Sequence, residues 1–188
     1  RKDRFMKIYL IFFFFMINVS SLILAQDLQS LVNSANNKIK SGDLKSAETL
    51  LQNVLDFDPS YAPALISFSK IWLHKGSLAR ANEHATLAVR INEEFRPWWD
   101  ELNAIKVAIN DGQKYVQKGN FNKAYSAYEA IFKKYPYYSQ AYYFMGVAKY
   151  KQKDLEGAAL SFENALKIYP DYQKAKKALI NVKKRLPK

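Results

Sequence analysis

A repeat of 34 residues is the feature that most constrains the fold of this 188-residue chain. Four strings align without gaps: residues 41–51 (SGDLKSAETLL), 75–85 (KGSLARANEHA), 118–128 (KGNFNKAYSAY) and 152–162 (QKDLEGAALSF). Gly42 and Gly76 are 34 residues apart, as are Gly119 and Lys153, whereas Gly76 and Gly119 are 43 apart, which indicates nine inserted residues. A fixed period of this length is typical of stacked units that bury their apolar faces against one another.

Each repeat unit has the pattern of two short helices joined by a tight turn. Apolar residues recur at helical spacing on both sides of the turn, and in the first helix they are Leu28, Leu31, Val32, Ala35 and Ile39. The sequence contains no cysteine, which excludes a disulfide framework, a thiolate zinc site and a lipid-modified cysteine. Stability must therefore come from packing, and the predicted fold class is all-α.

Small residues stand in phase in all four units. In the first helices they are Ala35, Ser69, Gly112 and Gly146, and in the second helices they are Ala47, Ala81, Ala124 and Ala158. Small side chains at these points allow two helices to cross closely. With these positions, the chain resembles the tetratricopeptide repeat family from about Leu28 to Tyr172. The resemblance implies an α-solenoid of four helix-turn-helix repeats followed by a C-terminal capping helix.

The family pattern places the repeats at residues 28–61, 62–95, 105–138 and 139–172. Residues 96–104 are then an insertion that extends a helix, and residues 173–188 form a basic capping helix with a narrow apolar stripe. Gly42, Gly76 and Gly119 can adopt the positive φ that ends a first helix. Two departures stand out, because Lys153 replaces the turn glycine of the fourth unit and Glu93 replaces the proline that closes the second.

The insertion contains two adjacent tryptophans, Trp98 and Trp99. Pro97 suits the first turn of a helix, so we expect an extended first helix from Pro97 to Lys118 in the third unit. Adjacent residues on a helix do not point the same way. We therefore expect one tryptophan to pack against the second unit, whereas the other is either packed between repeats or exposed to a partner.

The first 25 residues have the pattern of a secretory signal peptide. Lys7 precedes ten uninterrupted apolar residues from Ile8 to Ile17, and residues 1–5 lie before a plausible start at Met6. We expect cleavage after Ala25, or alternatively after Ser21. The predicted location is the bacterial periplasm or cell surface, although an uncleaved segment would act as a membrane anchor.

Positive charge and tyrosines are concentrated in the C-terminal half of the chain. The formal charge of the whole chain is +12; residues 26–95 carry a net charge of −1, whereas residues 96–188 carry +10 and eleven of the thirteen tyrosines. This bias predicts an acidic protein or peptide partner, and the expected export argues against DNA or RNA. The alternative is that the tyrosines fill packing positions and the lysines form a solvated face.

The resemblance also implies a concave groove lined by first helices. The candidate groove residues are Asn36, Lys40, Lys70, His74, Lys106, Asn110, Gln113, Gln117, Tyr143, Val147 and Lys151. Lys, Asn and Gln side chains can hydrogen-bond an extended peptide and hold acidic groups. The predicted basic surface of the capping helix consists of Lys174, Lys176, Lys177, Lys183, Lys184 and Arg185.

Nothing in the sequence indicates catalysis. His74 and His84 are the only histidines, and there is no metal-binding cluster, nucleophile elbow or phosphate-binding glycine loop. We expect neither a metal nor a cofactor. The resulting hypothesis is a non-catalytic binding module of the cell envelope, with a partner in its groove. The alternative is a membrane-anchored assembly factor whose basic half docks on anionic lipid or cell-wall polymer.

Overall fold

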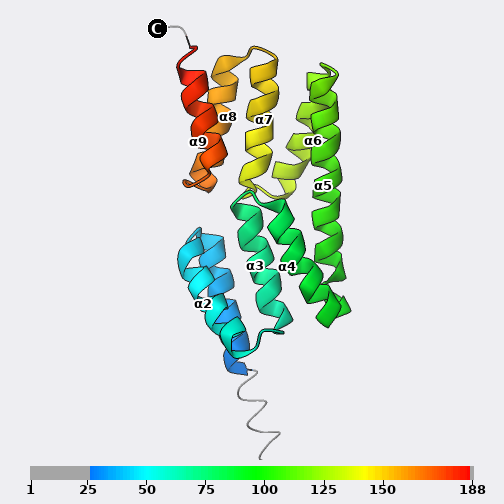
Figure 1. Ribbon diagram of the computed structural model, residues 1–188, viewed down its shortest axis with the longest axis vertical. Coiled ribbons are helices and arrows are strands. Elements are labelled where there is room, and N and C mark those ends of the chain that lie inside the picture. Colours follow the sequence, from blue (N-terminus) through cyan, green and yellow to red (C-terminus); the bar gives the residue numbers. More distant parts are fainter. Residues whose placement is uncertain (1–25, 187–188) are drawn as a thin grey trace, which may run out of the picture. The chain divides into compact units, whose positions relative to one another are not determined.

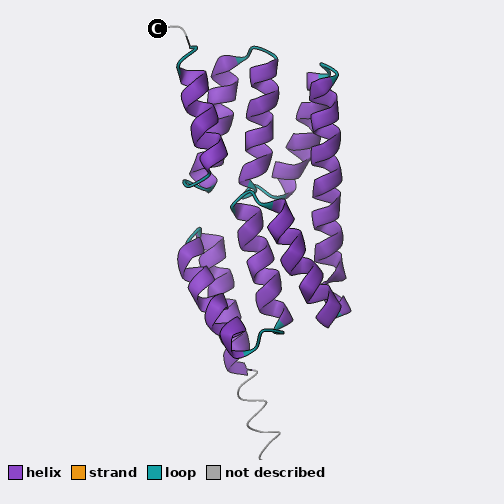
Figure 2. Ribbon diagram, viewed as in Figure 1, coloured by secondary structure: helices purple, strands orange, loops and turns teal. Residues whose placement is uncertain are grey.

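The computed structural model describes residues 26–186, and the regular elements in this range are helices (Figure 2). Residues 1–25, where the export signal is predicted, lie outside the described residues. The described helices include none that is both long enough and apolar enough to cross a membrane. The chain forms two compact units, divided between residues 64 and 65. The all-α helical repeat fold expected from the sequence is confirmed.

The first unit contains a helix over residues 26–41 and α2, Leu44–Phe57. Buried side chains follow helical spacing in both helices: Leu28, Val32, Ala35 and Ile39 in the first, then Leu44, Ala47, Leu51 and Val54 in the second. Between the helices, the Asp43 carboxylate accepts a hydrogen bond from the Ser46 backbone N–H at 3.2 Å. This bond caps the N-terminus of α2.

The second unit contains the remaining repeat helices (Figure 1). α3 starts just before the division between the units. The helices of this part of the chain are α3 Ala62–His74, α4 Leu78–Ile91, the short 3-10 helix η1 Glu93–Phe95, α5 Arg96–Gln117, α6 Phe121–Lys134, α7 Ser139–Lys151, α8 Leu155–Ile168 and α9 Gln173–Lys183. Packing joins α4 to α5, α5 to α6, α6 to α7, α7 to α8 and α8 to α9.

The turn inside each repeat has the same backbone geometry. Gly42, Gly76 and Gly119 have φ values of +83°, +72° and +71°, and Lys153 has a φ of +71°. In each turn the residue after the one with positive φ donates its backbone N–H to the carbonyl five residues before it. Asp154, for example, donates to the Lys149 carbonyl at 3.0 Å. This is the Schellman arrangement that ends a helix. Lys153 therefore takes a left-handed conformation at the position where the other turns have glycine.

The small residues of the repeat lie where helices cross. Ala81, Ala124 and Ala158 have no exposed surface. At Gly146 a Cβ atom would lie 2.6 Å from the Phe162 ring, which is closer than real side chains approach. The small side chains thus allow the first and second helix of a repeat to pack face to face.

α5 is the 22-residue helix produced by the insertion, close to the extent predicted from Pro97. Trp98 Nε1 donates to Ser69 Oγ on α3 at 2.8 Å, and Trp99 Nε1 donates to Thr86 Oγ1 on α4 at 2.9 Å. Both indoles are half-buried and hydrogen-bonded to neighbouring helices, as the packing alternative predicted. Since α3 and α4 both contact the start of α5, each indole finds a partner despite pointing a different way.

The C-terminal end of α3 meets the turn between α6 and α7 (Figure 1). Ser139 Oγ donates to the His74 carbonyl at 2.7 Å, and the His74 ring stacks on Tyr137 with centroids 4.2 Å apart. The family pattern predicted that His74 would line an open groove. His74 is only 8% exposed, so it does not do so. Burial lowers the pKa of His74 from 6.5 to about 4, because the charged ring would lose its hydration.

Candidate partner-binding site

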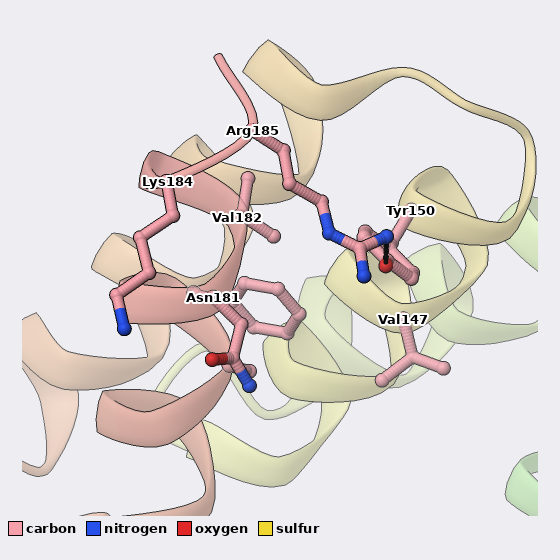
Figure 3. A pocket seen from close by; sticks show the side chains of 8 residues that line it. Val147, Tyr150, Asn181, Val182, Lys184 and Arg185 are labelled. Carbon is pink, nitrogen blue, oxygen red and sulfur yellow. Dashed lines mark hydrogen bonds between the residues drawn. The ribbon is translucent and has the colours of Figure 1, made fainter.

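A cavity of about 450 Å³ lies between α7 and α9 in the last part of the chain (Figure 3). α8 lies beneath it and contributes Phe162. The cavity is lined by Val147, Tyr150, Phe162, Ala178, Asn181, Val182, Lys184 and Arg185. Val147 and Tyr150 are three residues apart on α7, and on α9 Asn181 and Val182 follow Ala178 by three and four residues. Helical periodicity therefore brings these side chains to the two facing surfaces.

The floor of the cavity is apolar. Phe162 is 2% exposed and packs against Gly146 of α7, while Val182 is also 2% exposed. Val147 and Ala178 are half-buried and pack against the same cluster. An apolar side chain of a ligand would therefore leave water when it entered the cavity.

The rim of the cavity is polar and basic. An Arg185 Nη1 hydrogen donates to the Tyr150 hydroxyl, and the guanidinium carbon lies 5.4 Å from the centre of the Tyr150 ring. Figure 3 shows the guanidinium of Arg185 reaching across to Tyr150; Asn181 lies on α9, and Lys184 and Arg185 follow directly after its end. The contact with Tyr150 restricts the long arginine side chain, which lowers the entropy cost of binding an anion there.

The charges of α9 differ in their partners. Lys176 pairs with Asp171 at 3.2 Å, and Lys183 pairs with Glu163 at 2.8 Å. Within residues 26–186, no acidic side chain forms an ion pair with Lys184 or Arg185. The positive charge at the cavity rim is therefore uncompensated within the described chain.

The structure distributes the candidate groove residues over several surfaces. Val147 lines the α7–α9 cavity, and Lys151 follows it one turn later on α7. Tyr143 is half-buried, and its ring centre lies 5.7 Å from that of Phe162 and 5.5 Å from that of Tyr172. Tyr143 thus contributes to packing between helices, and its role in binding stays a prediction.

The other candidates are not among the residues that line this cavity. Lys106 lines a separate cleft between α4 and α5. On α5, Asn110 and Gln117 are exposed and Gln113 is partly exposed. The Lys70 Nζ lies 5.9 Å from the centre of the Trp98 ring. In the first unit, Lys40 is exposed and Asn36 is half-buried.

The candidate groove did not include Tyr150, Asn181 or Phe162, which line the cavity. Asn181 lies on α9, which we predicted to be a cap and therefore did not treat as a groove helix. Continuing the repeat by one more first helix would have placed α9 opposite α7. The apolar stripe on the predicted capping helix was the available signal.

Residues 111–173 match the family model described as the tetratricopeptide repeat. This part of the chain belongs to the tetratricopeptide repeat family. The match covers the end of α5, all of α6, α7 and α8, and the start of α9. It confirms the family that the repeat pattern suggested.

Solved structures of tetratricopeptide repeat proteins are similar to the chain at low identity. The first repeat domain of Spaghetti, bound to an HSP90 peptide, is 18% identical over 85% of this chain and 93% of that one, with a TM-score of 0.34. PilF of Pseudomonas aeruginosa is 18% identical over 84% and 69%, with a TM-score of 0.38. YrrB, a repeat protein with an unusual peptide-binding site, is 21% identical over 83% and 91%, with a TM-score of 0.39. A comparison with curated proteins gave no match.

Proposed function

We propose that the chain is an exported, non-catalytic interaction module that binds an acidic peptide or protein segment in the α7–α9 cavity. The observation that carries this proposal is the combination of an apolar floor with two uncompensated basic groups at the rim. Tetratricopeptide repeats are generally protein-interaction scaffolds, which supports a binding role rather than catalysis.

The size of the cavity suits part of a peptide. A volume of about 450 Å³ lies in the range of protein sites that enclose small ligands. It accommodates one large apolar side chain, with the Phe162 ring as the floor. A carboxylate next to that side chain in the partner would then reach Arg185 or Lys184, and the Asn181 amide could bond the partner's backbone.

The predicted location is the cell envelope. The support is the apolar run from Ile8 to Ile17 behind Lys7, which has the pattern of an export signal. Cleavage after Ala25 would release the repeats, and retention of the run would anchor them to the membrane. The intact mass of the protein from the envelope fraction would distinguish these two outcomes.

Selection from a random peptide library on the purified protein tests the binding proposal. We expect enrichment of peptides that place Asp or Glu beside Leu, Ile or Phe. For a selected peptide, Arg185→Gln should weaken binding about tenfold, because a charge-assisted hydrogen bond is lost. Lys174→Gln, which removes the same kind of charge from an exposed position on α9, is the matched control.

The outcomes separate the peptide proposal from the membrane alternative. Equal loss of affinity in Arg185→Gln and Lys174→Gln would show general charge attraction and would refute a specific cavity. Vesicles of phosphatidylglycerol and phosphatidylcholine test the alternative directly. Salt-sensitive vesicle binding without any selected peptide would favour docking on an anionic lipid surface.

A further inference from the structure

A second cavity, of about 390 Å³, lies between α4 and α5, on helices that do not line the α7–α9 cavity. Residues at helical spacing on both helices line it. From α4 come Leu78, Asn82 and Thr86, and from α5 come Trp99, Asn103 and Lys106. The cavity therefore follows the line along which the two helices pack, and the insertion that lengthens α5 supplies Trp99 and Asn103.

Trp99 forms a fixed wall of this cavity. Its indole Nε1 donates to Thr86 Oγ1 at 2.9 Å, and the guanidinium carbon of Arg96 lies 5.3 Å from its ring centre. The bond to Thr86 holds the ring against α4, and Arg96 contacts the ring from the helix that carries it. Leu78 adds an apolar surface to the same cavity, so a flat or branched apolar group of a ligand would find preformed contacts there.

Two amide groups on the cavity lining have unused hydrogen-bonding capacity. Asn82 Nδ2 donates to the Leu78 carbonyl at 3.2 Å, whereas Asn82 Oδ1 and Asn103 Nδ2 have no partner within residues 26–186, and solvent barely reaches either atom. Unpaired polar groups in such positions cost free energy. Rotation about the last torsion of an asparagine is easy, so small rotations can present both atoms to a ligand.

We propose that this α4–α5 cavity is a second binding site, which takes an extended peptide segment through its backbone amide. The unused atoms are one acceptor and one donor, and a peptide group supplies the complementary N–H and C=O. An apolar side chain of that segment would lie between Leu78 and Trp99. Lys106 is exposed and forms no ion pair with an acid of the described chain, so a nearby acidic residue in the segment would add to the binding.

The site can be tested with a minimal probe, N-acetyl-leucine N-methylamide, and nitrogen-15 NMR spectra of the full chain. The chain has three tryptophans, and Trp99 is the one that lines this cavity, so its indole N–H signal reports binding while the other two serve as internal references. A probe of this size should saturate the Trp99 shift with a dissociation constant on the order of 1 mM. N-acetyl-leucine methyl ester lacks one N–H donor and should bind at least about tenfold more weakly.

Variants identify the residues that bind the amide. Asn82→Ala and Asn103→Ala should each weaken probe binding several-fold, whereas Asn122→Ala, at an exposed asparagine on α6, should leave it unchanged. No shift of the Trp99 signal at tens of millimolar probe would overturn the proposal, as would equal binding of the amide and the ester. The amide and ester are compared on the unmodified protein, so the test does not depend on whether a variant folds.

Discussion

Lowering the pH should destabilise the second unit through His74. The ring is buried against Tyr137, and its pKa in the folded protein is about 4, against 6.5 for a free histidine. Between these two values the unfolded chain binds a proton that the folded chain does not. Stability is therefore fully present above pH 6.5, falls as the pH drops toward 4, and levels off below that value.

The two pKa values of His74, in the folded and in the unfolded chain, set how much stability is lost on acidification. Each unit of pKa difference corresponds to 1.36 kcal/mol. The free energy of unfolding should therefore fall by about 2 kcal/mol between pH 7.5 and pH 5, and by about 3 kcal/mol at pH 4. Carboxylates also titrate in this range, so the quantity to compare is the difference between the protein and a variant without His74.

Urea unfolding at a series of pH values measures this difference. His74→Phe keeps an aromatic ring against Tyr137 but cannot take up a proton, so its stability should fall less on acidification. His84→Phe, which makes the same exchange at the other histidine, is the matched control variant. If His74→Phe and the original protein show the same pH dependence, the buried neutral histidine does not control the acid response.

Further substitutions test the turn, the cavity rim and the helix crossing. Lys153→Gly should raise the free energy of unfolding by about 0.5–1 kcal/mol in urea titrations, because Lys153 holds a φ of +71° that glycine adopts without strain. Tyr150→Phe removes the hydroxyl that holds Arg185 and should weaken a selected acidic peptide a few-fold at an unchanged melting temperature; an equal affinity would show that the contact does not organise the rim. Ala124→Leu should cost about 1–3 kcal/mol of stability in thermal melts, because Ala124 has no exposed surface where α5 and α6 cross.

The local parts of the fold could be predicted because neighbouring residues encode them. The positive φ at Gly42, Gly76 and Gly119 follows from the absence of a side chain, and the in-phase alanines indicate where helices cross. Lys153 shows that the repeat imposes the turn even on a residue that resists it. The turn's hydrogen bonds, such as Asp154 N–H to the Lys149 carbonyl, compensate for the strain.

The two tryptophans show where this local reasoning ends. Helical geometry correctly separates the directions of Trp98 and Trp99, but it does not say what lies in each direction. Their partners, Ser69 and Thr86, lie 29 and 13 residues away in the sequence. Only the packing of α3 and α4 around α5 decides that both indoles are half-buried.

The charges of α9 are a second case in which tertiary structure decides. Lys176, Lys183, Lys184 and Arg185 look equivalent in the sequence, and we predicted one basic surface. Asp171 and Glu163, from the turn before α9 and from α8, neutralise two of them and leave the pair at the cavity uncompensated. The candidate site thus depends on which acids the fold brings to α9, and the net charge of the helix does not reveal this.

The nine-residue insertion explains why His74 is buried and does not line the groove that the family pattern predicts. At 1.5 Å per residue, the 22 residues of α5 extend about 33 Å, whereas the 13 residues of α3 extend about 20 Å. α5 packs against both α4 and α6, and the turn between α6 and α7 contacts the end of α3. Tyr137 and Ser139 then cover His74 from 63 and 65 residues away. The family pattern assumes that successive first helices have similar lengths, and the longer α5 accounts for the different surroundings of His74.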